Sequence, residues 1–269
     1  MNNFFKISLY TILDQMRSKS FYVLLGIAVF FVLLIRGCYK ADFLVNGELV
    51  DSVTLAWYAS RVAFHLIANG MILMAALLSM SIFSRDESNG SLVLFLSRPV
   101  SRWQYVMGRI GGTWVLATAF MFILHATIFF ITWIKTGGVI PGYLTASLIC
   151  SLNLLFIILL VALLSLFMPD FIAAMMTLTV AAVSFLSDGV FLVMQNRAVQ
   201  ATLSENMFAE PTLWRVLFPK ISLLQHYAVI HITGNDFQSM GPVHPLLNLL
   251  AYCLLSAAVL LFNFNRKEI

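Results

Sequence analysis

The chain has 269 residues, of which 61% are hydrophobic and only 10% are charged. A soluble domain has roughly 45–50% apolar and about 25% charged residues, so this composition excludes an ordinary soluble protein. The net charge of +4 fits contact with the anionic inner leaflet of a membrane, and we expect no nucleic acid partner.

The apolar stretches are long enough to cross a bilayer as helices, which takes about 20 residues at 1.5 Å each. They are continuous rather than alternating, which excludes a transmembrane β-barrel. We therefore predict an all-α integral membrane protein, with six transmembrane helices in one domain over residues 1–269. The predicted spans are Phe21–Ile35, Val62–Phe83, Ile110–Ile134, Tyr143–Met168, Phe171–Met194 and Leu246–Phe264.

Residues 1–20 lack the cleavage pattern of a removable signal and predict an amphipathic helix in the membrane interface. Apolar residues recur at helical spacing on one face, and polar residues occupy the other. The apolar set is Phe5, Leu9, Ile12, Leu13 and Met16, and the polar set is Lys6, Tyr10, Asp14 and Arg17. This helix serves either as a membrane anchor alone or also as a docking surface for a cytoplasmic partner.

Residues 84–109 gather acidic, turn-forming and basic side chains in one segment, which we call the coupling segment. Leu92, Phe95 and Leu96 have the spacing of a short surface helix. Pro99 ends it, and Ser101 is placed to cap the helix that continues into the third span. The alternative is an ordinary cytoplasmic loop whose arginines follow the positive-inside rule.

Basic residues near the span ends are in slight excess on the side that holds the N-terminus, so we expect both termini to be cytoplasmic. Charge within the predicted spans is scarce, with Asp188 near one boundary, which argues against an ion-coupled carrier. Asn69-Gly70 and Asn153 also fall within spans. Such polar side chains bond helices together more often than they bind a substrate.

Motifs for nucleotide binding or hydrolysis do not occur. There is no P-loop, no zinc helix and no nucleophile elbow, and the three cysteines and five histidines have no metal-site spacing. We expect no catalytic residues, no metal and no directly bound cofactor. The histidines, including His65, His125, His226 and His231, are interpreted as structural.

The coupling segment resembles the segment between spans two and three of type-2 ATP-binding cassette permeases. The resemblance rests on Glu87-x-x-Gly90-x-Leu92, on Leu96-x-x-Pro99-Val100-Ser101-Arg102, and on Gly108-Arg109 at the start of span three. Arg109 replaces the family's usual lysine and keeps its charge. The six-span layout and the N-terminal helix are similar to that family as well.

The resemblance implies a permease subunit, most simply an exporter, in a bacterial or archaeal cytoplasmic membrane. It would pair with a second copy or homologue and bind two separate cytoplasmic ATPase subunits that carry ATP and Mg²⁺. The residues implied in ATPase coupling lie in the coupling segment and at the turn between spans four and five. They are Asp86, Glu87, Gly90, Leu92, Leu96, Pro99, Ser101, Arg102, Arg109, Pro169 and Asp170.

The segment 195–245, on the expected outer side, is too apolar for a solvated loop. Resemblance to the family implies a re-entrant outer gate within 212–233, formed by Trp214, Phe218, Pro219 and Tyr227. The alternative is an interfacial helix with Trp214 and Tyr227 as aromatic anchors. Two rival functions also stay open: a membrane-embedded enzyme, and a scaffold subunit that does not transport.

Overall fold

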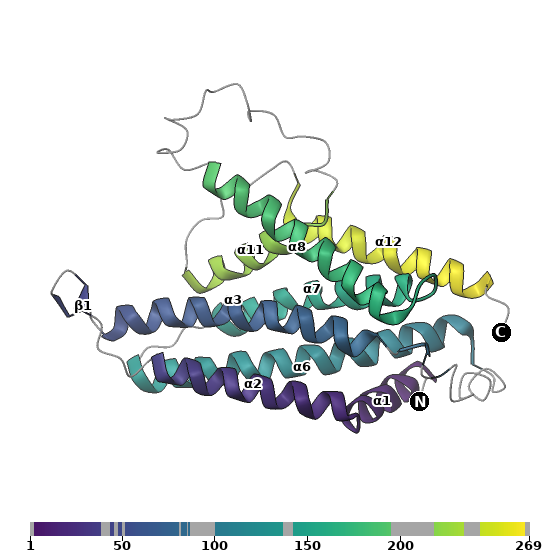
Figure 1. Ribbon diagram of the computed structural model, residues 1–269, viewed down its shortest axis with the longest axis horizontal. Helices are drawn as coiled ribbons and strands as arrows, with labels where there is room; N and C mark the ends of the chain where they lie inside the picture. Colours follow the sequence, from purple (N-terminus) through teal and green to yellow (C-terminus); the bar gives the residue numbers. More distant parts are fainter. Residues whose placement is uncertain are drawn as a thin grey trace.

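The computed structural model describes residues 3–38, 44–45, 48–49, 52–80, 82–84, 86, 100–136, 142–194, 218–233 and 243–266. Within these ranges the chain forms eight helices and one pair of two-residue strands (Figure 1). The helices are α1 (Asn3–Met16), α2 (Lys19–Cys38), α3 (Ser52–Ser79), α6 (Arg102–Thr136), α7 (Gly142–Leu164), α8 (Asp170–Met194), α11 (Ile221–Thr233) and α12 (Pro245–Arg266).

Five of the described helices are long and apolar enough to cross a membrane, and they match the last five predicted spans. The first predicted span lies within α2, whose described apolar stretch, Phe21–Phe30, is shorter. A multi-pass helical protein is therefore confirmed, while the count of six spans stays a prediction.

Two apolar spans begin earlier than the hydrophobic pattern alone predicts, although the predicted cap at Ser101 already places the start of α6 at Arg102. Helix α6 starts at Arg102 and runs unbroken into the third span, and the span within α3 starts at Trp57. Arg61, which we expected outside the membrane, therefore lies inside an apolar helix. The pattern misplaced these ends because a helix continues through polar residues that protein or interfacial water can accommodate.

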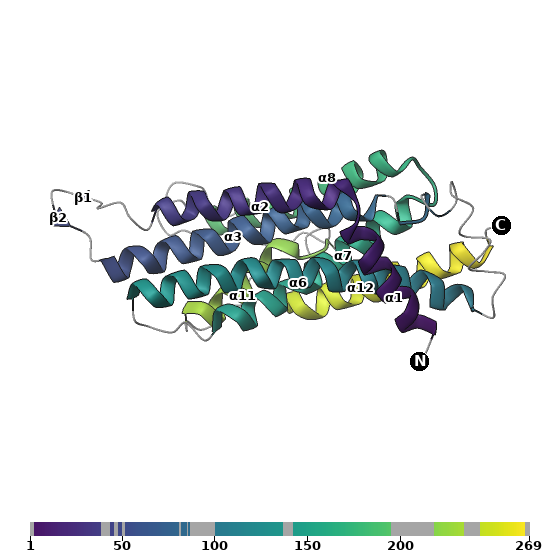
Figure 2. The same ribbon diagram turned by 90° about the horizontal axis from the view of Figure 1, so that it is seen from below.

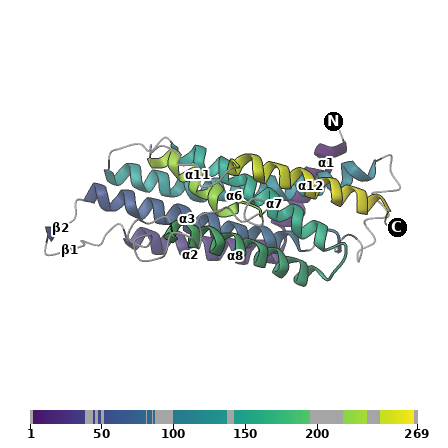
Figure 3. The ribbon, with the colours of Figure 1, turned by 90° about the horizontal axis from the view of Figure 1, so that it is seen from above.

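Helix α7 lies at the centre of the bundle, where it packs against α3, α6, α8, α11 and α12 (Figures 1 and 3). Its sequence is apolar around most of its circumference, which is typical of a helix surrounded by others. Helix α2 is peripheral and packs along α3 and α6.

Polar side chains join the central helices within the core. His125 of α6 is buried, stacks on Phe64 of α3 at 4.5 Å between ring centroids, and bonds Ser147 of α7 at 2.8 Å. The hydroxyls of Ser60 and Thr132 are 2.7 Å apart. Such bonds between neighbouring helices satisfy polar groups that lipid could not, which fits the structural interpretation of His125.

Both chain termini lie at the same end of the bundle (Figure 1). At this end α1 runs steeply across the long helices rather than along them (Figure 2). The orientation is that expected of a helix lying in the membrane interface.

A small strand pair lies at the opposite end, where β1 (Leu44–Val45) pairs antiparallel with β2 (Glu48–Leu49). We did not predict this pair, but two strands of two residues leave the predicted all-α fold class unchanged. The sequence between the strands is Asn46-Gly47, which is the strongest short signal for a two-residue hairpin.

Candidate functional site

The first turn of α6 is built by a capping interaction. Ser101 precedes the helix, and its backbone N–H donates to Oε1 of Gln104 at 3.3 Å. Serine at the cap with glutamine three residues later is the capping-box pattern. The predicted cap at Ser101 is confirmed, and it fixes where the coupling segment passes into α6.

Helix α1 docks on three glycines of α6 that follow this first turn. A Cβ atom at Gly112 would lie 2.6 Å from the carbonyl oxygen of Ser8, and one at Gly108 would lie 2.9 Å from Cγ2 of Ile7. Only glycine permits so close an approach. Gly108 and Gly112 form a small-xxx-small pair, the pattern that lets two helices in a membrane pack closely.

The docked helix has three faces rather than two. Ile7, Thr11 and Gln15 are buried against the bundle. The predicted apolar face stays exposed, in a position to contact lipid, and includes Phe5, Leu9, Leu13 and Met16. The predicted amphipathic pattern was right for two faces, but it gave no sign that the third, partly polar stripe is the one that packs on protein.

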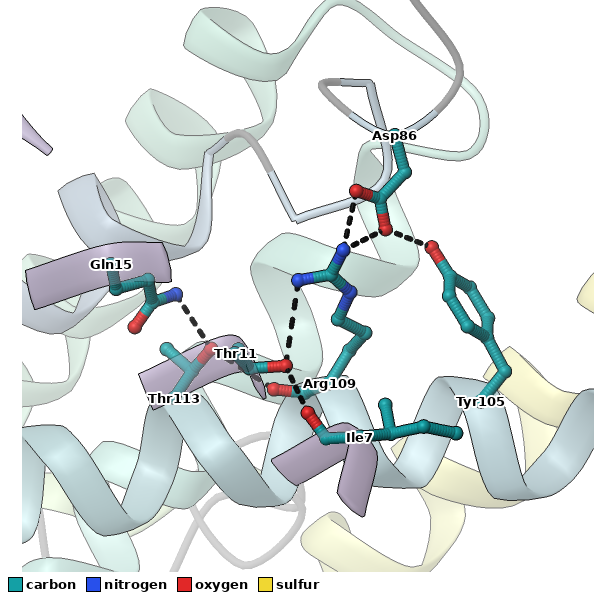
Figure 4. A network of polar contacts seen from close by, with 7 residues as sticks. All are labelled: Ile7, Thr11, Gln15, Asp86, Tyr105, Arg109 and Thr113. Atoms are coloured by element: carbon teal, nitrogen blue, oxygen red, sulfur yellow. Dashed lines mark hydrogen bonds and ion pairs between the residues drawn. The ribbon is translucent and has the colours of Figure 1, made fainter. Parts of the chain in front are cut away.

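A buried ion pair lies beside this contact (Figure 4). The guanidinium of Arg109 donates to both carboxylate oxygens of Asp86, and the hydroxyl of Tyr105 donates to the same carboxylate. The Asp86 and Arg109 side chains are only 6% and 4% exposed. Asp86 stands before residues 87–99 and Arg109 stands after them, so the pair joins the two flanks of the coupling segment.

Helix α1 closes the network from its other side (Figure 4). Arg109 donates to the Thr11 hydroxyl at 3.4 Å, and this hydroxyl donates to the Ile7 carbonyl at 2.9 Å. The Arg109 guanidinium also faces the Tyr10 ring, 5.2 Å from its centroid. Because the charge is paired, hydrogen-bonded and covered by an aromatic ring, its burial is compensated.

The same interface continues one turn further along α6. Gln15 donates to the Thr113 hydroxyl at 2.8 Å, and Thr113 donates to the Arg109 carbonyl at 3.0 Å. Gln15 also reaches the carbonyl of Leu78, near the end of α3, at 3.5 Å. Helices α1, α3 and α6 therefore meet at one polar junction.

The turn between α7 and α8 is attached to the same end of α3. Ser84 donates to the carboxylate of Asp170, the first residue of α8, and Pro169 immediately precedes it. The resemblance implies a shared role in coupling for Pro169, Asp170 and the coupling segment, and the structure joins the start of that segment to Asp170 through this bond.

The end of α12 also reaches this junction. Phe264 packs on Tyr105 at 6.0 Å and on Phe83 at 5.4 Å between ring centroids. Arg102 donates to the Asn265 carbonyl at 3.0 Å. We did not predict this contact, since nothing in the residue pattern near the end of α12 indicates a partner.

Six of the eleven residues that the resemblance implied in coupling are described: Asp86, Ser101, Arg102, Arg109, Pro169 and Asp170. The structure brings all six to one end of the bundle, and it buries Asp86 and Arg109. The others lie outside the described residues and stay predictions: Glu87, Gly90, Leu92, Leu96 and Pro99.

Away from this junction, α11 begins deep in the bundle. Asn153, at the midpoint of α7, donates to the Ile221 carbonyl at 3.2 Å. Ser184 of α8 donates to the Pro219 carbonyl at 2.8 Å, and Asn248 accepts from the Lys220 N–H at 3.0 Å. Side chains from three helices thus hold the backbone at residues 219–221.

The far end of α11 lies beside the start of α7, since a Cβ at Gly142 would meet the His231 carbonyl at 1.6 Å. Helix α11 therefore covers half of α7, from its midpoint to its first residue. Among the predicted gate residues, Pro219 is buried and Phe218 and Tyr227 are half-buried, while Trp214 lies outside the described residues. Tyr227 packs against His231 and His244 at 5.3 and 4.9 Å between ring centroids.

Within the described ranges, no three His, Cys, Asp or Glu side chains lie close enough together to share a metal ion. The described polar groups at both ends of the bundle bond helices and backbone to one another.

Comparison with protein families places the chain in a transporter family. The family model described as "ABC-2 family transporter protein" matches residues 10–269, which is nearly the whole chain. No curated protein matches the chain significantly.

Proposed function

Because the chain belongs to the ABC-2 family of transporter proteins, we propose that it forms a dimeric export pathway driven by separate ATPase subunits. Its partners would be a second copy or a homologue and two cytoplasmic ATPases that carry ATP and Mg²⁺. The family match is to a membrane component without an ATPase domain. This agrees with the lack of a P-loop in the sequence.

The Asp86–Arg109 ion pair is the observation that carries the proposal. It joins the flanks of the coupling segment and is bonded to α1 through Thr11. Because both charged side chains are buried, their role is to position the segment, and contact with an ATPase falls to residues between them. We assign that contact to Glu87, Gly90, Leu92, Leu96 and Pro99, with Ser101 and Arg102 at its edge.

Movement of the segment would pass into the bundle along two routes. One route is α6 with α1, which the glycine contacts hold together. The other is α8, through the bond from Ser84 to Asp170. Closure of an ATPase dimer would then rock these helices between two arrangements and open a path between the two permeases.

We assign α11 as a re-entrant segment that closes the outer end of this path. Its support is the depth at which residues 219–221 are held, beside the midpoint of α7. Irregular backbone at membrane depth is tolerated where protein surrounds it and satisfies its polar groups, as Asn153, Ser184 and Asn248 do here.

The protein would reside in a bacterial or archaeal cytoplasmic membrane with both termini in the cytoplasm. In that orientation α1, the coupling segment, the α7–α8 turn and the end of α12 all face the ATPases. The apolar face of α1 would lie in the inner leaflet, with Lys6 and Arg17 at the head groups.

The direct test is purification of the tagged chain from native membranes in mild detergent, followed by an ATPase assay. We expect a P-loop subunit in equal proportion and ATP hydrolysis that vanadate inhibits. A pure chain without an ATPase partner would contradict the proposal and favour a scaffold subunit.

A further inference from the structure

A stripe of polar residues follows one edge of α3. Arg61, His65 and Asn69 recur at four-residue spacing, so they lie on one side of the helix. Arg61 and Asn69 are exposed and His65 is half-buried. The adjoining strip of α3 is also exposed but apolar, with Val62 and Leu66 67% and 45% exposed.

Two polar residues of α11 face this stripe. Gln225 donates to Oδ1 of Asn69 at 3.0 Å, and its side chain also makes a polar contact with His65. His226 interacts electrostatically with both His65 and Arg61. We use the name polar track for these five residues together: Arg61, His65, Asn69, Gln225 and His226.

The polar track lies at a depth where lipid contact is unfavourable. All three of its α3 residues fall within the apolar span Trp57–Ser79, and Asn69 is near its midpoint. Ionisable and amide side chains at such depth face a water-filled path or a polar partner, because hydrocarbon cannot satisfy them. The polar track lies between α3 and α11, and α11 is the helix that we assign to the outer gate.

The polar track presents mainly hydrogen-bond donors. The ionisable groups that act on His65 are Arg61 and His226, and neither is an acid. Guanidinium, imidazole and amide N–H groups all donate to phosphate and carboxylate oxygens, and Arg does so with paired, charge-assisted bonds. Beside these donors, the exposed strip with Val62 and Leu66 offers an apolar surface.

From this juxtaposition we propose that the polar track binds the phosphate or carboxylate head group of an amphipathic substrate, whose apolar part lies along the Val62–Leu66 strip. This inference rests on the proposed export function and names the substrate class for it. The anion is supplied either by a membrane lipid or by a soluble molecule, and the test separates the two.

The test uses the full chain with its ATPase, reconstituted in phosphatidylcholine nanodiscs, and three probes: short-chain phosphatidylglycerol, short-chain phosphatidylcholine and inorganic phosphate. Binding is followed by tryptophan fluorescence, to which Trp57, one turn from Arg61 on α3, contributes. We expect saturable binding of phosphatidylglycerol, with a Kd that Arg61→Gln raises roughly tenfold or more, since charged hydrogen bonds are the strong ones. Arg61→Lys, which keeps the charge, should recover most of the affinity, and Val62→Gln, which alters the neighbouring strip, should change head-group binding less.

Each outcome decides one point. Binding of phosphatidylglycerol alone supports a lipid source, and equal, Arg61-dependent binding of inorganic phosphate supports a soluble anion at the same donors. Equal binding of both lipids, unchanged in Arg61→Gln, would overturn the inference. ATP hydrolysis is measured in the same sample: hydrolysis without anion binding refutes the polar track alone, whereas loss of the ATPase during purification refutes the export function.

Discussion

Replacing Gly112 with alanine should release α1 from the bundle. The added Cβ would lie 2.6 Å from the Ser8 carbonyl oxygen and 2.8 Å from Cβ of Thr11, and neither atom is the end of a flexible side chain. Overpacking of a close contact costs about 1–3 kcal/mol. Since about 1.4 kcal/mol is a factor of ten, the undocked population of α1 should rise between roughly fivefold and a hundredfold.

The neighbouring residue provides a matched control. A Cβ at Gly111 would lie 3.4 Å from the tip of the Phe4 ring and 3.7 Å from Oγ of Ser8, which are ordinary contacts with the ends of side chains. Gly111→Ala and Gly112→Ala gain the same helix propensity, about 1 kcal/mol relative to glycine, so this term cancels in the comparison.

Hydrogen–deuterium exchange of the amides in Asn3–Met16 measures the docking in the reconstituted protein. We expect faster exchange in Gly112→Ala and exchange close to that of the native protein in Gly111→Ala. Equal exchange in the two variants would refute the argument that α1 depends on the bare backbone of α6.

Three further predictions concern the two ends of the bundle. Asp86→Asn leaves the Arg109 charge buried without its counter-ion, so the unfolding free energy should fall by about 3–5 kcal/mol; an unchanged thermal melting temperature would contradict this. Ser184→Ala removes the partner of Pro219 and Ile221, at a cost of about 1–3 kcal/mol. It should speed amide exchange in α11, whereas Thr179→Ala, whose hydroxyl is exposed and bonds only its own helix, should not. Glu87→Arg should leave membrane insertion intact but uncouple ATP hydrolysis, and native ATPase activity with full retention of the partner would argue against the coupling assignment.

The spans were predictable because continuous apolar runs of sufficient length have few alternatives in a bilayer. Five of them match the helices observed, and the cap at Ser101 was readable from local residue types. Helix ends were less certain, since polar residues such as Arg61 and Arg102 continue a helix when something accommodates them. The Asn46-Gly47 hairpin was a local signal that we overlooked.

The sequence indicated which segments form the candidate site, but it did not indicate which of their residues contact one another. Motif resemblance drew attention to Asp86 and Arg109, yet only the fold shows that they bond each other and are buried. The pairing of Ser84 with Asp170 joins residues 86 positions apart, and no periodic pattern reports such a contact. Gly108 and Gly112 did carry a readable signal, the small-xxx-small spacing, which indicates close helix packing without naming α1 as the partner.

The character of the helix contacts suggests which parts of the protein move together. Helix α1 meets α6 through close backbone contacts at Gly108 and Gly112. Separating the two helices would break the bonds from Arg109 to Thr11 and from Gln15 to Thr113, and would uncover the Asp86–Arg109 pair. These contacts together outnumber the single bond from Ser84 to Asp170 and the single bond from Arg102 to Asn265. We therefore expect α1 and α6 to move as one body during transport, with sliding at the contacts to α8 and α12.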